Sequence, residues 1–116
     1  MRDFKHSQQS VTVEASGTYS SPFRFPRDCA FVGALFPAMD DGDIGLEITM
    51  DGTNYHKLLD PADGAAAVLC ATGNDPAWID FSDWIRFVPD LPDVRCRFTC
   101  ASQASGAVTI HLFFRG

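Results

Sequence analysis

The sequence predicts an all-β fold, an antiparallel β-sandwich or jelly roll of about eight strands. Three observations lead to this prediction. Apolar and polar residues alternate with a period of two along most of the chain, and no segment keeps the spacing of an amphipathic helix. Turn-forming residues recur roughly every 8–12 residues. The 116 residues include ten Phe, whose rings are suited to filling the space between two packed sheets.

Three strands are expected in the first part of the chain. Residues 9–16 alternate, with Val11 and Val13 on one side. Residues 22–26, "PFRFP", have proline at both ends, which confines this short strand to a sheet edge or to a switch between sheets. Residues 30–37, "AFVGALFP", are apolar on both faces, as in a central strand covered on both sides. Within this strand, Gly33 indicates a bulge or a close approach of another group.

The stretch "LEITMDGTNYHKLLD", residues 46–60, predicts a β-hairpin. Asp51-Gly52 supplies the turn, because glycine readily takes the positive φ that a tight hairpin requires. A return strand follows in "YHKLLD". Alternation assigns Leu46, Ile48 and Met50 to the core and places Glu47 and Thr49 on the polar face.

The second half of the chain continues the pattern. The apolar run "AAAVLCA" follows a turn at "PADG", and "AWIDFSDW", residues 77–84, fits either a strand or one helical turn. "WIRFVP" and "DVRCRFTCAS" are expected to be strands. In the last strand, Val108, Ile110, Leu112 and Phe114 face one way, opposite Thr109, His111, Phe113 and Arg115.

The chain divides into an N-terminal segment and one domain. Residues 1–9 are mostly polar, with Phe4 as the single aromatic anchor, and residues 10–116 have neither a linker nor a repeat. We expect residues 1–9 to form an extended arm that reaches a neighbouring subunit, with a free tail as the alternative. Residues 10–116 are expected to form a single sandwich domain.

The charge balance argues against a nucleic-acid partner. The net charge is −6, and the nine Lys and Arg residues are scattered rather than clustered. No apolar run approaches the ~20 residues that span a bilayer, and the N-terminus lacks the apolar core of a secretory signal. We therefore expect a protein that is made in the cytoplasm and has no membrane partner.

The four cysteines have no spacing typical of a zinc site. Cys96 and Cys100 lie four residues apart on a predicted strand, roughly 13 Å, which is too far for a disulfide. Together with Cys70, they are interpreted as small buried apolar residues of a reduced protein. The state of Cys29 stays open.

No catalytic, cofactor or metal site is expected. His6, His56 and His111 have no nucleophile or carboxylate in a recognisable arrangement, and the last two are expected to face solvent. A glycosidase pair at Asp80 and Asp83 would need an open cleft, which a small sandwich rarely has. The acidic run at 40–43 does not have the spacing of a calcium-binding EF-hand loop.

Several of these motifs occur in a similar order in a known group of proteins. "FVGALFP", "LEITMDGTNYHKLLD", "WIRFVP" with "VRCRF", and the terminal "AVTIHLFFRG" together resemble the short β-sandwich virion structural proteins of tailed bacteriophages and gene-transfer particles. The resemblance covers residues 30–116. It implies a non-enzymatic particle component, such as a capsid decoration (cement) protein, a head-fibre base or a tail-associated subunit.

The resemblance also implies partners. They would be the major capsid protein or other virion proteins, and the protein would act as a homo-oligomer, with a trimer favoured, located in the virion. The expected assembly contacts lie in the arm and at an aromatic residue on the polar face of the last strand, where large rings often anchor interfaces. These residues are Arg2, Asp3, Phe4, Lys5, His6 and Phe113.

A second function stays open. The DGT-aromatic hairpin also resembles that of carbohydrate-binding sandwiches such as discoidin-like domains. In that case Trp78, Trp84 or Tyr55 would stack on a sugar beside Asp or His hydrogen-bonding groups. The alternative function is therefore a carbohydrate-binding module or a tail-associated adsorption protein.

Overall fold

The computed structural model describes residues 6–27, 29–40, 42–72, 75–80, 88–89 and 91–116, with the side chains of residues 6 and 70–72 left aside. These residues form strands and loops without a helix, so the predicted all-β class is confirmed. No helix in this part of the chain is long and apolar enough to cross a membrane. The predicted strand at "WIRF" and the choice between strand and helical turn at 81–84 lie outside the described residues.

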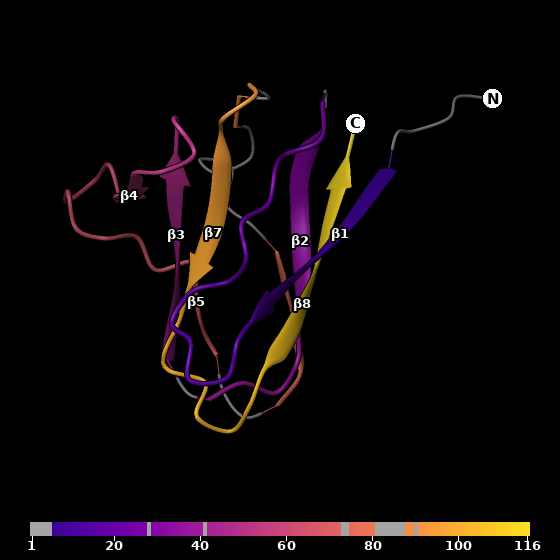
Figure 1. Ribbon diagram of the computed structural model, residues 1–116, viewed down its shortest axis with the longest axis vertical. Helices are drawn as coiled ribbons and strands as arrows, with labels where there is room; N and C mark the ends of the chain where they lie inside the picture. Colours follow the sequence, from indigo (N-terminus) through magenta and orange to yellow (C-terminus); the bar gives the residue numbers. More distant parts are fainter. Residues whose placement is uncertain (1–5, 28, 41, 73–74, 81–87, 90) are drawn as a thin grey trace.

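The strands form two antiparallel sheets that face each other (Figure 1). The first sheet has the order β1 (His6–Val13), β8 (Val108–Arg115), β2 (Ala30–Phe36), β6 (Ala77–Asp80). In the second sheet, β3 (Gly42–Thr49) pairs with β7 (Arg95–Thr99) along one edge. Along its other edge β3 pairs with β4 (Tyr55–Lys57) and then with β5 (Cys70–Thr72). This arrangement is consistent with the predicted sandwich.

Phenylalanine rings fill the space between the sheets, as the composition predicts. Phe31 of β2 stacks on Phe114 of β8 with their ring centroids 4.8 Å apart. Phe98 of β7 reaches across from the second sheet and packs against Phe36 at 5.6 Å. Each of these side chains is at most 3% exposed. Because aromatic pairs at these distances add to the burial of apolar surface, this cluster is the centre of the core.

The segment from Tyr19 to Phe25 runs along the free edge of β7. Tyr19 pairs with Thr99, and Phe23 pairs with Cys96, through isolated bridges. The rings of Phe23 and Phe25 are buried in the core, whereas Arg24 between them is partly exposed. The prolines at 22 and 26 allow pairing at an edge, as the sequence predicts, and prevent a longer regular strand.

The prediction of an arm over residues 1–9 differs from the structure at residues 6–9. These residues belong to β1, which pairs with β8 from His6↔Arg115 to Val13↔Val108. Polar side chains are tolerated in this part of β1 because it is an edge strand. Its pairing with β8 uses backbone hydrogen bonds, which do not require apolar side chains. The Gln9 side chain also donates from Nε2 to the carbonyl oxygen of Arg24 at 2.6 Å. Residues 1–5 lie outside the described part of the chain.

The expectation that β2 is covered on both faces is wrong for the described residues. β2 does lie inside the first sheet, between β8 and β6. Its outward side chains Val32 and Leu35 are nevertheless 39% and 44% exposed. Both predictions for Gly33 are confirmed, because the register with β8 shifts between Phe31 and Gly33, and Trp78 approaches the backbone there closely.

The β3–β4 hairpin is confirmed, with Gly52 at φ +81° in its turn. Leu46 is buried, but Met50 lies beyond the end of the strand and is 54% exposed, so its assignment to the core is wrong. Thr49 keeps the outward direction that alternation predicts, opposite Tyr55 and Arg95. It is fully buried because the turn folds over it, with Gly52 N donating to its Oγ1 at 3.0 Å.

The cysteines whose side chains are described carry free thiols. Cys96 is 1% exposed and lies in the core, whereas Cys100, just after β7, is partly buried. Burial raises the pKa of the Cys96 thiol to about 12. The interpretation of Cys96 as a small apolar core residue is therefore confirmed, and Cys29 proves to be buried as well.

Candidate functional site

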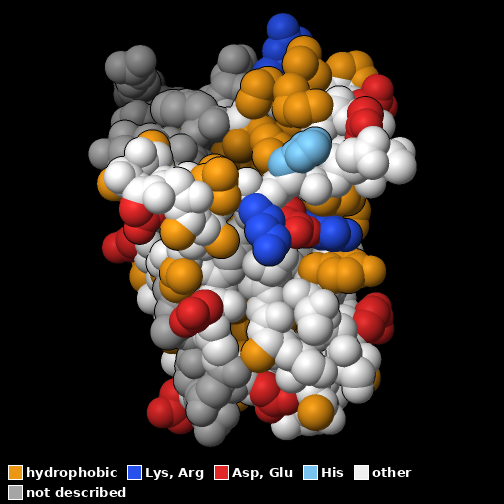
Figure 2. Space-filling model, turned by 90° about the vertical axis from the view of Figure 1, so that its left-hand side faces the viewer, with side chains coloured by type: hydrophobic (Ala, Val, Ile, Leu, Met, Phe, Trp, Pro, Cys, Tyr) orange, Lys and Arg blue, Asp and Glu red, His pale blue; other side chains and the backbone are white. Residues whose placement is uncertain are grey.

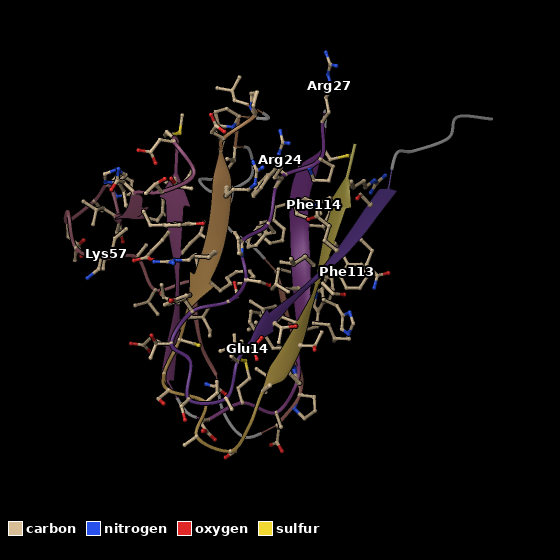
Figure 3. All side chains as sticks on the ribbon, in the orientation of Figure 1. Glu14, Arg24, Arg27, Lys57, Phe113 and Phe114 are labelled. Carbon is tan, nitrogen blue, oxygen red and sulfur yellow. The ribbon has the colours of Figure 1, made fainter. Side chains whose placement is uncertain are left out.

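The outer face of the second sheet gathers charged and aromatic side chains. Figure 2 shows acidic and basic groups meeting near the middle of this face, beside hydrophobic ones. Lys57 on β4 and Phe113 on β8 lie on opposite sides of the molecule, with Phe114 between the sheets (Figure 3). The sandwich therefore has two separate outer faces, one on each sheet.

On the second sheet, Arg97 lies between two tyrosine rings. Its guanidinium carbon is 3.8 Å from the ring centroid of Tyr55 and 4.1 Å from that of Tyr19. The strand register produces this Tyr–Arg–Tyr stack. The row of cross-strand partners on one side of Arg97 contains Tyr55, Thr49 and Arg95. The row on the other side contains Tyr19, which forms a bridge with Thr99. Cation–π contact on both faces fixes the plane of the guanidinium group.

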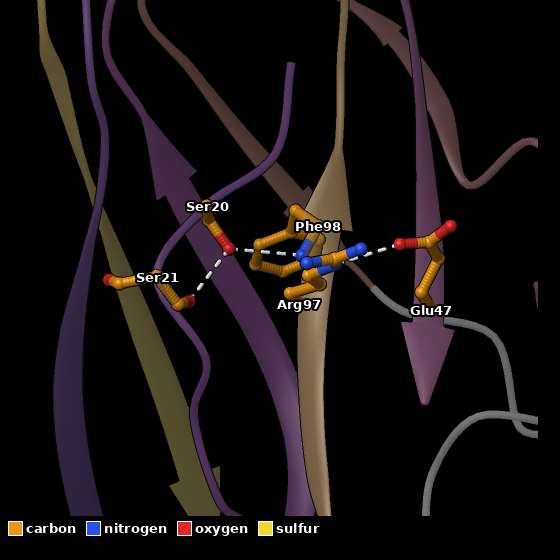
Figure 4. A network of polar contacts seen from close by, with 5 residues as sticks. All are labelled: Ser20, Ser21, Glu47, Arg97 and Phe98. Atoms are coloured by element: carbon orange, nitrogen blue, oxygen red, sulfur yellow. Dashed lines mark hydrogen bonds and ion pairs between the residues drawn. The ribbon is translucent and has the colours of Figure 1, made fainter. Parts of the chain in front are cut away.

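Glu47 holds Arg97 from the side. Arg97 Nε donates to Glu47 Oε1 at 2.7 Å, and the two side chains are only 22% and 15% exposed (Figure 4). Glu47 is the direct cross-strand partner of Arg97 on β7 and of Lys57 on β4. One carboxylate thus lies between two cations in a single row across the sheet. Since the stack and the ion pair act together, Arg97 is held in one orientation.

A hollow opens beside this row, and Gly45 is part of its lining. A Cβ atom at Gly45 would lie 2.7 Å from Thr99 Oγ1 and 3.4 Å from the carbonyl oxygen of Ala67. Thr99 therefore packs closely on Gly45. We call the whole space the Gly45 hollow, and its volume is about 460 Å³. Residues 66–68 and Leu58 line it with apolar groups, and its polar lining comes from Thr18, Tyr19, Asp43, Glu47, Lys57, Arg97 and Thr99.

The outer face of the first sheet is apolar at its centre. Trp78 and Phe113 lie side by side with their ring centroids 5.5 Å apart. Leu35 is the direct cross-strand partner of Trp78, and Val32 is the extra residue of the bulge in β2. Trp78, Leu35 and Val32 are 48%, 44% and 39% exposed, and Phe113 is partly exposed. We call these four residues the apolar face.

Gly33 explains how the rings of the apolar face lie. It pairs with Phe113 on one side and with Asp80 on the other. A Cβ atom at Gly33 would lie 2.6 Å from Cζ2 of Trp78, so the indole rests on bare backbone. Trp78 Nε1 donates to Asp80 Oδ1 at 2.7 Å, which fixes the ring further. The aromatic pair is therefore positioned before any partner binds.

The structure describes only some of the residues predicted to be assembly contacts. Phe113 lies on the apolar face and also lines a shallow groove of about 460 Å³ with Val32 and Gln8. The backbone of His6 begins β1, and its side chain is not described. Arg2, Asp3, Phe4 and Lys5 lie outside the described residues. Whether any of these residues contacts a partner stays a prediction.

The histidines and acidic groups whose side chains the structure describes are scattered over the molecule. His56 is exposed, and the partly exposed His111 shares a hydrogen bond with Ser10, whose Oγ lies 3.0 Å from its Nδ1. In the described part of the chain, no group of three or more His, Cys, Asp and Glu residues is placed to hold a metal ion.

Sequence reasoning missed most of the Gly45 hollow. Tyr55 is a predicted stacking residue, but Tyr19, Arg97 and Glu47 are not predicted to meet it. Alternation does place Glu47 and Arg97 on outward faces, which is the only local signal. No family model, curated protein or solved structure matches this chain.

Proposed function

We propose that the protein is a non-enzymatic virion structural protein of a tailed bacteriophage or related particle. It acts as a capsid decoration (cement) or head-fibre-base protein that binds the capsid surface and stabilises or extends it. The observation that carries this proposal is the apolar face, where the exposed Trp78 lies beside the partly exposed Phe113. The sequence resemblance names the kind of assembly.

The apolar face has the properties of an interface anchor. Its aromatic pair rests on Gly33, and Asp80 fixes the indole of Trp78, so little side-chain freedom is lost on binding. Large rings at the centre of an interface commonly contribute about 2 kcal/mol or more each. A repeated shell multiplies a modest single contact, because neighbouring copies raise the effective concentration of binding sites.

We further propose that the sandwich is a jelly roll of about eight strands. Two assignments are made to compare the strand order with a jelly roll. Residues 19–25 are counted as an edge strand of the second sheet, and β4 and β5 are counted together as one interrupted strand. The first sheet then reads β1-β8-β2-β6, and the second reads 19–25, β7, β3, β4/β5. That is the order of two interleaved Greek keys. Jelly rolls occur in viral capsid proteins and in lectins, so the topology suits the proposal without deciding it.

The partners proposed here are the major capsid protein or other virion proteins, with the chain acting as a homo-oligomer, a trimer being favoured. Nucleic acid and membrane are not proposed as partners, in keeping with the net charge of −6 and the scattered cations. The proposed location is the virion.

Co-sedimentation with particles of the phage or prophage that encodes the protein tests this function. The wild-type protein should sediment with the particles, and Phe113→Ser should lower its occupancy about tenfold or more, because an aromatic anchor of the apolar face is lost. Tyr19→Ser, on the opposite face, is the matched control and should bind normally. Deleting residues 1–5 tests the arm and should also reduce occupancy.

Two results would contradict the proposal. One is a wild-type protein that stays in the supernatant and has a strictly monomeric mass by light scattering. The other is equal occupancy for wild type and Phe113→Ser, which would exclude the apolar face as the contact. Unchanged occupancy after deletion of residues 1–5 would refute the arm alone.

The alternative function, a carbohydrate-binding module or tail-associated adsorption protein, is favoured by a different surface. The Gly45 hollow combines an aromatic ring with several hydrogen-bonding side chains. Because the hollow and the apolar face belong to different sheets, one protein can have both activities.

A further inference from the structure

We propose that the Gly45 hollow is a binding site for a neutral saccharide. The inference gives the alternative function a location and does not depend on the capsid proposal. The hollow of about 460 Å³ is within the range of about 300–1,000 Å³ that is common for small-molecule sites. Thr99 and Gly45 both line it, and Thr99 Oγ1 packs so closely on the backbone of Gly45 that a Cβ atom there would lie 2.7 Å from it.

Tyr19 provides the apolar contact that a sugar ring requires. The Tyr19 ring packs on Arg97 and yet remains 54% exposed at the rim of the hollow. A phenol ring presents a flat, electron-rich surface on which the C–H groups of a pyranose can stack. The backbone bridge to Thr99 and the contact with Arg97 hold this ring in place, so stacking costs little entropy.

The polar lining suits adjacent hydroxyl groups. Glu47 offers acceptor oxygens, and Arg97 offers several N–H donors in a fixed plane, of which the described residues bond only Nε. Lys57 and Thr99 add a further donor and a hydroxyl at the same opening. A neighbouring donor and acceptor with fixed orientation can bind two vicinal hydroxyls at once, which fits a sugar better than an apolar ligand.

The charge of the lining favours a neutral ligand. Asp43 and Glu47 oppose Lys57 and Arg97, so the formal charges of the lining cancel. Arg97 is moreover already neutralised by its ion pair with Glu47. The whole chain carries a net charge of −6, which repels anions. A phosphate or a polyanionic sugar is therefore disfavoured, and the site is assigned to neutral hexose or N-acetylhexosamine units.

A glycan array with neutral oligosaccharides and with matched sialylated or uronic-acid oligosaccharides is the first test. Neutral saccharides should bind in preference to their acidic counterparts. The strongest neutral saccharide on the array is then titrated into ¹⁵N-labelled protein. The amide signals of Gly45 and Thr99 should move, and that of Gly33 on the other sheet should not.

Variants then locate the site. Tyr19→Ala and Thr99→Val should each weaken binding of that saccharide by about tenfold or more. Tyr19 is exposed, so its truncation should leave the fold intact, which circular dichroism checks. Trp78→Ala, on the apolar face, is the matched control and should bind as wild type does.

The proposal is overturned if no neutral saccharide binds, if acidic saccharides bind better, or if Trp78→Ala abolishes binding while Tyr19→Ala does not. Titration of the wild-type protein decides the question even if a variant fails to fold. Failure here is separable from failure of the capsid proposal, because Tyr19→Ala should still sediment with particles and Phe113→Ser should still bind the saccharide.

Discussion

Asp51 organises the β3–β4 turn with one side chain. Its Oδ1 accepts from Thr53 N and Asn54 N, both at 2.8 Å, and from Thr49 Oγ1 at 3.0 Å. Its Oδ2 accepts from Asn54 Nδ2 at 2.8 Å. Hydrogen bonds to the charged form, chiefly from the Asn54 and Thr53 backbone, hold the pKa of this carboxyl well below its usual range. The aspartate that looks like part of a site in the sequence is therefore a structural element of the turn.

Asp51→Asn should make the thermal stability of the protein less dependent on pH in the acid range. A carboxyl whose pKa is lowered by folding stabilises the protein above its unfolded pKa of about 3.9. That contribution is lost as the pH falls below this value towards the folded pKa. We expect the variant to melt below wild type at pH 7, with the difference shrinking as the pH approaches 2. Thermal melts across this range measure the effect.

The control for this prediction is Asp75→Asn. Asp75 is exposed and has no hydrogen bond or ion pair among the described residues. Its melting curve should follow that of wild type at every pH. If the gap between wild type and Asp51→Asn stays constant from pH 7 to pH 2, the carboxylate does not act through its charge.

Single residues that act locally could be predicted from the sequence. Gly52 has the positive φ that an Asp-Gly turn requires, and Ile110, Leu112 and Phe114 are buried as their alternation indicates. Met50 was assigned wrongly because alternation does not say where a strand ends. The burial of Thr49 could not be predicted, because it depends on a turn that folds back over the sheet.

At the scale of elements, one buried hydroxyl strengthens the attachment of residues 19–25 to β7, beside the backbone hydrogen bonds between them. Ser20 Oγ accepts from Phe98 N at 3.0 Å and donates to the carbonyl oxygen of Ser21 at 2.9 Å (Figure 4). Ser20 is 1% exposed, so water cannot replace these bonds. The segment carries both Tyr19, at the Gly45 hollow, and Phe23, in the core.

Ser20→Ala should therefore destabilise the protein by about 1–3 kcal/mol, because the buried N–H of Phe98 loses its acceptor. Urea denaturation measures the change. Ser21→Ala is the matched control. Ser21 Oγ accepts from Thr12 N at 3.0 Å in an exposed position, so water can take its place and the loss should be smaller. Equal effects of the two substitutions would contradict a special role for Ser20.

Element positions explain why residues 6–9 and the outer face of β2 differ from the predictions. Both predictions relied on side-chain polarity, which indicates burial but not pairing. Residues 6–9 of β1 are polar and nevertheless pair with β8, because an edge strand is held by its backbone. β2 is apolar on both faces, and its outward side chains Val32 and Leu35 are nevertheless exposed.

At the scale of the molecule, the fold class could be predicted, whereas only single members of the candidate surfaces, such as Phe113 and Tyr55, could be. Period-two alternation and recurring turns are local signals, and they define a sandwich. The Tyr–Arg–Tyr stack joins residues 19, 55 and 97, which meet only through long-range strand pairing. The apolar face likewise joins positions 32, 35, 78 and 113 across three strands.

Because Cys96 is buried between the sheets, the rate of its alkylation can be used to measure how often the core opens. Alkylation requires a thiolate, and a thiol with its pKa raised to about 12 supplies almost none at pH 8. Iodoacetamide should therefore modify the partly buried Cys100 in the folded protein and reach Cys96 only when the two sheets separate. The rate of carbamidomethylation at Cys96, followed by mass spectrometry, should rise steeply with urea and report the opening of the core. Equal labelling of both cysteines in the native protein would mean that the core opens as readily as its edge.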